Sequence, residues 1–260
     1  MARWLASDVP EWVCIVLFLG GLPVLMLALQ ALVRRTMPEW ERGEHNDAAG
    51  VMLSAAVVVY SVAVGLCVVT LWEKLDDARS ATEAEASNLL ALAEGSRVFG
   101  PTVQEQIRAG VIAYNRDVVD GWPQRVRGEP VARVGEDLDG LVLTVSGLAV
   151  ETQAQRAFVD DAVARLARAR ELRATSLRMA HEEQLPNVMW VAILGSSVVV
   201  LALCLTCGVR DGLLRRVLLV GVTATVGINL FLVVELNYPF YGSIRVGSEN
   251  YSAVVDELAR

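Results

Sequence analysis

Four long stretches without a charged side chain are the feature of this sequence that most limits its possible folds. They run from Trp12 to Val33, Val51 to Trp72, Val188 to Val209 and Val217 to Val234. Each has about 20 residues, the length that an α-helix needs to cross the hydrocarbon core of a bilayer. A mean hydropathy of +0.43 agrees with this interpretation. We therefore predict an all-α integral membrane protein with four transmembrane helices.

The polar segment between the second and third runs predicts a long helical stalk. Glu73 to Glu94 continues the second run without Pro or Gly, and Glu151 to Leu185 also lacks both over 35 residues. We expect these two helices to project from the bilayer as an antiparallel pair, the second entering the third run through a kink or short break at Pro186. The predicted organisation is a first transmembrane pair with a short arginine-containing loop (1–72), a polar helical stalk domain (73–186), a second transmembrane pair (187–236) and a short amphipathic tail (237–260).

Shorter elements are expected between the two stalk helices. Thr102 with Glu105 has the spacing of a capping box and predicts a helix start. Gln124 to Gly140 is rich in glycine and charge, so we expect a loop there, followed by a short helix around Leu141 to Leu148.

One face of the second run carries small, hydroxylated and valine side chains at intervals of three or four residues: Ser54, Val58, Ser61, Gly65 and Val68. Such a stripe most often lets two helices pack closely, and it can also line a narrow pore. Tyr60, beside the stripe, would gate such a pore or anchor a neighbouring helix.

Polar residues also accompany the fourth run. Asn229 lies well inside it, where an unpaired amide is costly, so we expect it to face another helix or water. Glu235 and Asn237 follow at the stalk-side boundary, where we expect water to hydrate Glu235. Around an oligomer axis the two would form a cation-attracting ring, or they would bond to the stalk helices. Pro239 is expected to end the helix, and Gly242 to let the chain turn.

The second run is preceded by His45 and Asn46. We expect Asn46 or its neighbour Asp47 to cap the helix that follows, and His45 is a candidate pH sensor.

Several functional classes lack their residues in this sequence. The centres of the four runs hold no Asp, Glu, Lys, Arg or His, which disfavours a proton relay or a voltage sensor. A net charge of −7 with no basic surface disfavours nucleic-acid binding. The sequence has no nucleophile with a base, no phosphate loop and no metal-ligand spacing. We therefore expect no enzyme activity, no catalytic or metal site and no cofactor.

The arginines suggest an orientation. The two short loops, 34–50 and 210–216, carry six arginines, whereas the terminal segments carry three. Because arginine in short loops favours the cytoplasmic side, the loops are expected in the cytoplasm and the stalk outside it.

Several short motifs together resemble one known family, the bacterial bestrophin-like membrane proteins, a domain of unknown function. The motifs are Glu44-His-Asn-Asp-Ala-Ala-Gly50, Glu85-Ala86 with Leu89, Tyr114 with Val118 and Trp122-Pro123, and Pro239-Phe-Tyr-Gly242 before Ile244-x-Val246. Two positions depart from the family pattern: Gly121 stands where an acidic residue is usual, and Ala93-Glu94 where a basic residue often follows.

The resemblance implies kinship with bestrophins, which are oligomeric anion channels with four membrane helices per subunit and a helical domain between the second and third. Bestrophins keep that domain in the cytoplasm, in conflict with the arginine count. We retain the extracytoplasmic expectation because it follows from these residues.

Two functions remain open. The first is an oligomeric ion channel with its pore along the second run. The second is a non-conducting, membrane-anchored scaffold or sensor whose stalk binds an envelope protein. In both, the expected partners are the lipid bilayer of a bacterial plasma membrane and further copies of the chain.

Overall fold

The structure is a computed structural model that describes residues 11–36, 46–182, 184–206, 212–242 and 244–260. The regular elements in these ranges are all helices. The chain divides into two compact units, which are described separately below. Unit 1 comprises Met1–Glu73 and Gln184–Ile244, and unit 2 comprises Lys74–Glu183 and Arg245–Arg260.

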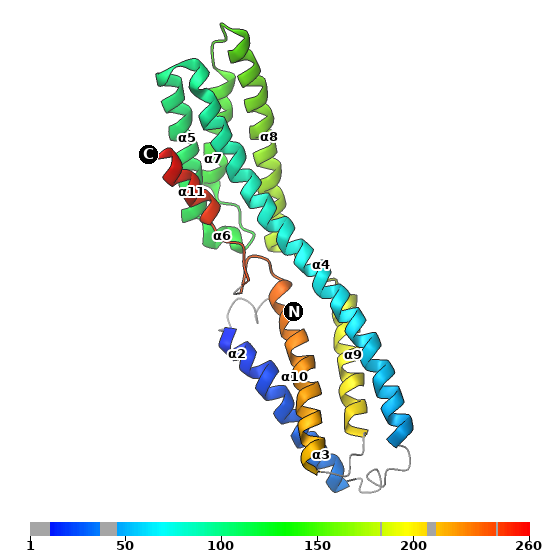
Figure 1. Cartoon of the computed structure of the whole chain (residues 1–260). Helices are drawn as coiled ribbons and strands as arrows, with labels where there is room; N and C mark the ends of the chain where they lie inside the picture. Colours follow the sequence, from blue (N-terminus) through cyan, green and yellow to red (C-terminus); the bar gives the residue numbers. More distant parts are fainter. Residues whose placement is uncertain (1–10, 37–45, 183, 207–211, 243) are drawn as a thin grey trace. The chain divides into compact units, whose positions relative to one another are not determined.

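The helices of unit 1 include the predicted membrane spans (Figure 1). They are α2 (Glu11–Ile15), a π-helical segment η1 (Val16–Gly21), α3 (Leu22–Thr36), the first part of α4 (Asn46–Gly95), α9 (Asn187–Thr206) and α10 (Gly212–Leu236). Four helical stretches are long and apolar enough to cross a membrane: Trp12–Thr36, Gly50–Phe99, Asn187–Leu205 and Gly212–Leu236. The prediction of four transmembrane helices is confirmed.

Packing in unit 1 centres on α10, which contacts η1, α3 and α9. Gly227 of α10 lies directly against the backbone carbonyl of Phe18 in η1. Most other large apolar side chains of these helices point outward, and Val24, Val188 and Val191 are 65%, 79% and 72% exposed. In hydrocarbon such faces need no protein cover, because lipid tails are as apolar as the side chains.

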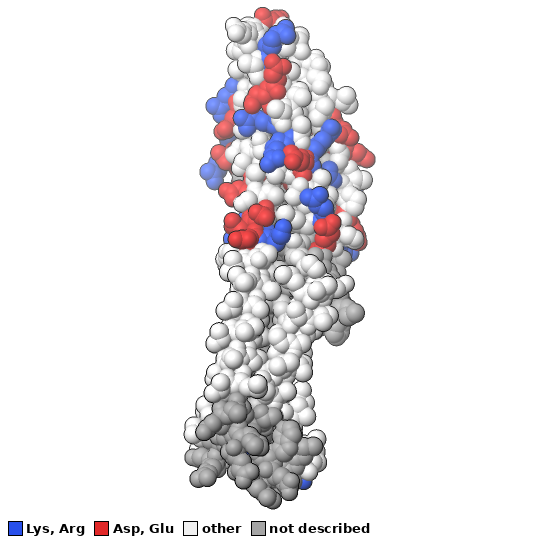
Figure 2. Space-filling view, turned by 90° about the vertical axis from the view of Figure 1, so that its right-hand side faces the viewer, with Lys and Arg blue, Asp and Glu red and all other residues white. Residues whose placement is uncertain are grey.

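Unit 2 is a helical bundle (Figure 1), and its helices enclose one apolar core. Besides the end of α4 it contains η3 (Ser96–Phe99, a 3-10 helix), α5 (Pro101–Asp120), α6 (Trp122–Val126), α7 (Ala132–Ser146), α8 (Gln153–His181) and α11 (Glu249–Leu258). Residues from five of these helices meet in the core, among them Leu89, Val111, Leu138, Leu166 and Val254. α11, near the end of the chain, packs on α5. Figure 2 shows groups of lysine, arginine, aspartate and glutamate interspersed with uncharged residues on the surface of unit 2.

The expected loop from Gln124 to Gly140 is wrong, because α6 and most of α7 occupy it. Val134 and Leu138 recur at helical spacing and are 2% and 1% exposed. Between them Glu136 is exposed and Asp137 is half-buried. Burial of the apolar side outweighs the low helix propensity of the glycines at 135 and 140.

The predicted cap at Thr102 is also wrong. α5 begins one residue earlier, at Pro101, and Gly100 is its N-cap with a φ of 85°. Proline suits the first helical position because it lacks the N–H that would stay unpaired there. A capping box does form at the start of α8, where Thr152 and Gln155 bond reciprocally.

The second stalk helix does not run continuously into the membrane helix. α8 ends at His181, and α9 begins at Asn187, directly after Pro186. The break is the short interruption that proline predicts.

Candidate functional site

The stripe on α4 is open in the single chain. Ser54, Val58, Ser61 and Gly65 are exposed, and Val68 is half-buried. The buried side of the same segment is made by Tyr60, Val64, Cys67 and Leu71. At 100° per residue the centres of these two faces lie about 110° apart around the helix. The stripe is therefore a distinct outward face of unit 1.

The hydroxyls of the stripe bond within their own helix. Ser54 Oγ donates to the carbonyl of Gly50 at 2.8 Å, and Ser61 Oγ donates to the carbonyl of Val57 at 2.7 Å. Neither serine therefore needs a partner from another helix. Both can face an apolar or an aqueous neighbour without leaving a donor unpaired.

Large aliphatic side chains flank the stripe on the exposed side. Val59, Val62, Leu66 and Val69 are 70%, 59%, 65% and 56% exposed, and Val58 within the stripe is 62% exposed. This surface is apolar and uncharged over about four helical turns.

Tyr60 lies on the buried side of α4 rather than on the stripe. It is 3% exposed, and Ser197 Oγ of α9 lies 3.4 Å from its hydroxyl. Ser197 also donates to the carbonyl of Ile193. Tyr60 thus contacts a neighbouring helix, one of the two roles considered for it.

The polar residues of α10 and its end occupy different environments. Asn229 is half-buried, whereas Glu235 is 7% and Asn237 0% exposed. The expectation that water hydrates Glu235 is therefore wrong for the single chain. The turn at Gly242, with a φ of 78°, brings its backbone against the Glu235 carboxylate.

Asn237 ties the end of α10 to the segment before α9. Its Oδ1 accepts a hydrogen bond from the backbone N–H of Leu185 at 2.8 Å. Leu185 is 3% exposed, so this bond satisfies a buried donor.

The structure describes only part of the segment with the candidate pH sensor and the candidate helix cap. His45 lies outside the described residues. Asn46 is the first residue of α4, but its side chain also lies outside what the structure describes.

Charged and polar side chains from several helices form a buried hydrogen-bonded network in unit 2. Glu85 of α4 and Arg125 of α6 form a two-point ion pair, with Nη1–Oε1 at 3.1 Å and Nη2–Oε2 at 2.5 Å. Arg125 Nη2 also donates to Ser176 Oγ of α8 at 2.6 Å, and Tyr114 of α5 donates its hydroxyl to Glu85 Oε1 at 2.6 Å. The network joins four helices.

Aromatic rings cover the guanidinium of this network. The Arg125 Cζ lies 5.6 Å from the Trp122 ring centroid and 5.2 Å from that of Tyr251 in α11. Burial lowers the pKa of Arg125, but the adjacent Glu85 carboxylate raises it, and the net result is a pKa above the ordinary value. Burial, and after it the charge of Glu85, raises the pKa of Tyr114 and of Tyr251. Arg125 is therefore charged, and both tyrosines are neutral, at physiological pH.

The role of Arg125 and Ser176 was not predicted from the sequence. Glu85, Tyr114 and Trp122 belong to the motifs that carry the family resemblance, but those motifs do not reveal that the three residues meet. Arg125 lies two residues after Trp122-Pro123, but Arg127 follows at the same interval, so the local sequence does not single it out.

The site residues do not assemble into a metal centre: within the described residues, no three potential ligands cluster.

Comparison with known proteins identifies the overall arrangement. A family model described as a Bestrophin-like domain matches residues 20–251. No curated protein matches the chain.

Solved structures with the same fold were found. A variant of a bacterial bestrophin homologue from Klebsiella pneumoniae superposes with a TM-score of 0.72 at 12% identity, covering 95% of this chain and 99% of that one. A second variant of that homologue gives a TM-score of 0.71 at 12% identity, covering 94% and 97%. At this identity the likeness concerns the fold.

Proposed function

The chain belongs to the bestrophin-like family, and from this premise we propose that it is an oligomeric ion channel of a bacterial plasma membrane whose pore follows α4. The observation that carries the proposal is the exposed stripe of Ser54, Val58, Ser61, Gly65 and Val68 in a helix able to span the bilayer.

The composition of the stripe suits a pore wall. Ser54 and Ser61 offer oxygens with free lone pairs at two levels, and Gly65 leaves room for a close approach. Val58, between the two serines, would form a narrow apolar ring. A ring of this kind can gate by dewetting and needs no charged residue.

A single copy of α4 cannot enclose a channel. The proposal therefore requires several copies of the chain around an axis, with their α4 stripes facing inward. Closed cyclic symmetry would repeat each stripe residue as a ring at one depth.

Ion flux into liposomes tests this function. Purified full-length chain reconstituted into vesicles should release a trapped ion faster than empty vesicles, and Val58→Ser should change that rate by widening and wetting the ring. Val191→Ser is the matched control, because Val191 is an outward valine of α9 that is 72% exposed. Equal flux from vesicles with and without protein would contradict conduction and favour the non-conducting scaffold or sensor.

The oligomeric state in detergent is a second test. A mass several times that of one chain supports a pore on a symmetry axis. A monomer under conditions that preserve the fold would contradict it.

A further inference from the structure

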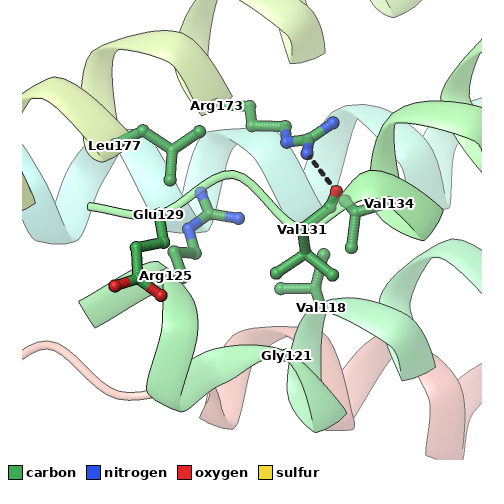
Figure 3. Close-up of a pocket in the computed structure, with 8 residues that line it drawn as sticks. All are labelled: Val118, Gly121, Arg125, Glu129, Val131, Val134, Arg173 and Leu177. Carbon is green, nitrogen blue, oxygen red and sulfur yellow. Dashed lines mark hydrogen bonds between the residues drawn. The ribbon is translucent and has the colours of Figure 1, made fainter. Parts of the chain in front are cut away.

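A small cavity in unit 2 lies beside the buried network (Figure 3). Its volume is about 10 Å³, and its apolar walls come from Val118, Val131, Val134 and Leu177. A space of this size accommodates a single particle about as large as a water molecule.

The cavity is faced by a donor that the protein does not satisfy. Arg125, which lines it, is 3% exposed and uses both terminal nitrogens for Glu85 and Ser176. Its remaining N–H, on Nε, is buried and has no acceptor in the part of the chain that the structure describes. A buried N–H without an acceptor is costly, so an acceptor in the cavity would stabilise the fold.

A second guanidinium lines the same space. Arg173 of α8 donates through Nη2 to the carbonyl of Val131 at 2.9 Å, the bond drawn dashed in Figure 3. Within the described residues no carboxylate forms an ion pair with Arg173, whereas the charge of Arg125 is matched by Glu85. The acid in the lining, Glu129, is an exposed side chain. The cavity therefore has a positive charge beside it that no buried acid neutralises.

We propose that this cavity binds one small monatomic anion, chloride in the cell, held by the Arg125 Nε–H and the charge of Arg173. The small space favours a monatomic ion over phosphate, sulfate and carboxylates, and the two guanidiniums disfavour a cation. Water is the alternative occupant, because the Val131 carbonyl and the Glu129 carboxylate at this space could accept its hydrogens, and the bromide experiment below distinguishes the two. An anion needs only donors, and the buried Arg125 Nε–H is a donor without an acceptor among the described residues.

The proposed anion site lies in unit 2, and its existence does not depend on conduction through α4. Bromide replaces chloride at such sites and scatters X-rays anomalously, so it is the probe. Crystals of the full chain soaked in sodium bromide should show an anomalous peak in the cavity, within hydrogen-bonding distance of Arg125 Nε. Electron density in the cavity without an anomalous signal, or a cavity without electron density, would overturn the proposal.

A solution measurement provides the second test. The melting midpoint of the full chain in detergent should be higher in sodium chloride than in sodium gluconate of equal ionic strength. The rise should be roughly 3–6 °C when chloride is at about ten times its dissociation constant. Arg173→Gln should remove most of this rise.

Arg170→Gln is the matched control, because Arg170 lies on the same helix but pairs with the exposed Asp139. It should retain the full chloride effect. Should Arg173→Gln fail to fold, Val134→Leu adds a methylene group to the cavity wall and should remove the effect by filling the space. A chloride effect of equal size in the wild type and in the cavity variant that folds would overturn the proposal.

Discussion

Gly227 of α10 lies so close to the carbonyl oxygen of Phe18 that a methyl group in place of its α-hydrogen would overlap that oxygen. The carbonyl belongs to η1, the π-helical segment Val16–Gly21. π-Helical turns are rare and are found mostly as single-turn bulges. The absence of a side chain at one position thus permits the close packing of α10 on the first membrane helix.

Gly227→Ala should therefore destabilise the protein. Overpacking of a tight contact costs about 1–3 kcal/mol, which exceeds the gain of about 1 kcal/mol that alanine brings to a helix interior. Thermal unfolding in detergent measures the change. Gly221→Ala is the control, since nothing lies within 4 Å of a Cβ at Gly221. It should be neutral or stabilising, and an equal loss in both variants would contradict the packing argument.

The buried ion pair should contribute far more than a surface pair. Glu85→Gln leaves Arg125 charged and buried without a carboxylate, so the free energy of unfolding should fall by about 3–5 kcal/mol. Asp161→Asn removes the exposed pair with Arg165, whose atoms are 2.6 Å apart, and should cost less than about 1 kcal/mol. Denaturant unfolding of the two variants compares them directly, and similar losses would contradict the expected difference.

Two equally buried tyrosines should respond differently to loss of their hydroxyls. Tyr114 and Tyr251 are both 0% exposed. Tyr114 donates to Glu85 at 2.6 Å, whereas the Tyr251 hydroxyl faces the same ion pair and makes no hydrogen bond of normal geometry among the described residues. Tyr114→Phe should cost about 1.5–3 kcal/mol, because it removes a hydrogen bond to a charged group.

Tyr251→Phe keeps the ring over Arg125 and should change stability little. Each substitution is the control for the other, since both delete one oxygen from a buried ring. The same unfolding experiment decides between them. A larger loss at Tyr251 than at Tyr114 would contradict the prediction.

The membrane architecture was predictable because its determinant is local. A run such as Val51 to Trp72 is recognised from length and absence of charge alone, with no knowledge of its neighbours. The same reasoning failed for α7, because two glycines and a high density of charge obscured the spacing of Val134 and Leu138. That spacing acquires meaning only when α5 and α8 cover it.

The network around Arg125 was not predictable for a different reason. The segment from Glu73 to Pro186 has 14 basic residues, and Arg125 resembles the others in sequence. Its partners Glu85 and Ser176 lie 40 and 51 positions away. Their meeting depends on how the helices of unit 2 pack, which local patterns do not contain.

The pair of aspartates between α5 and α7 should make stability depend on pH. Burial, and after it the charge of Asp117, a hydrogen bond to Asp117 and the charge of Glu136, raises the pKa of Asp137 above its ordinary value. Asp137 Oδ2 is buried without a partner among the described residues. Because the folded pKa is raised, this group's stabilising contribution is complete below the ordinary pKa and is lost as the pH rises through the raised value.

Asp137→Asn should remove this loss of stability at higher pH. The variant should gain stability over the wild type as the pH rises from about 4 to 7, measured as the difference in unfolding midpoint at each pH. Asp120→Asn, an exposed position on the same helix as Asp117, provides the comparison. A difference between Asp137→Asn and wild type that is constant over this range would contradict the assignment.

The side of the membrane that holds unit 2 can be decided by labelling. We propose that it is extracytoplasmic, from the six arginines in the two short loops, although the bestrophin kinship implies the cytoplasm.

Single cysteines at positions 45 and 150, His45→Cys and Val150→Cys, would be placed in a chain whose four native cysteines are replaced. An impermeant maleimide should then label position 150 in intact cells, and position 45 only after permeabilisation. The reverse pattern would put unit 2 in the cytoplasm and leave the four-span count intact. Equal labelling of both positions in intact cells would contradict the four-span topology itself, because an odd number of spans must separate them.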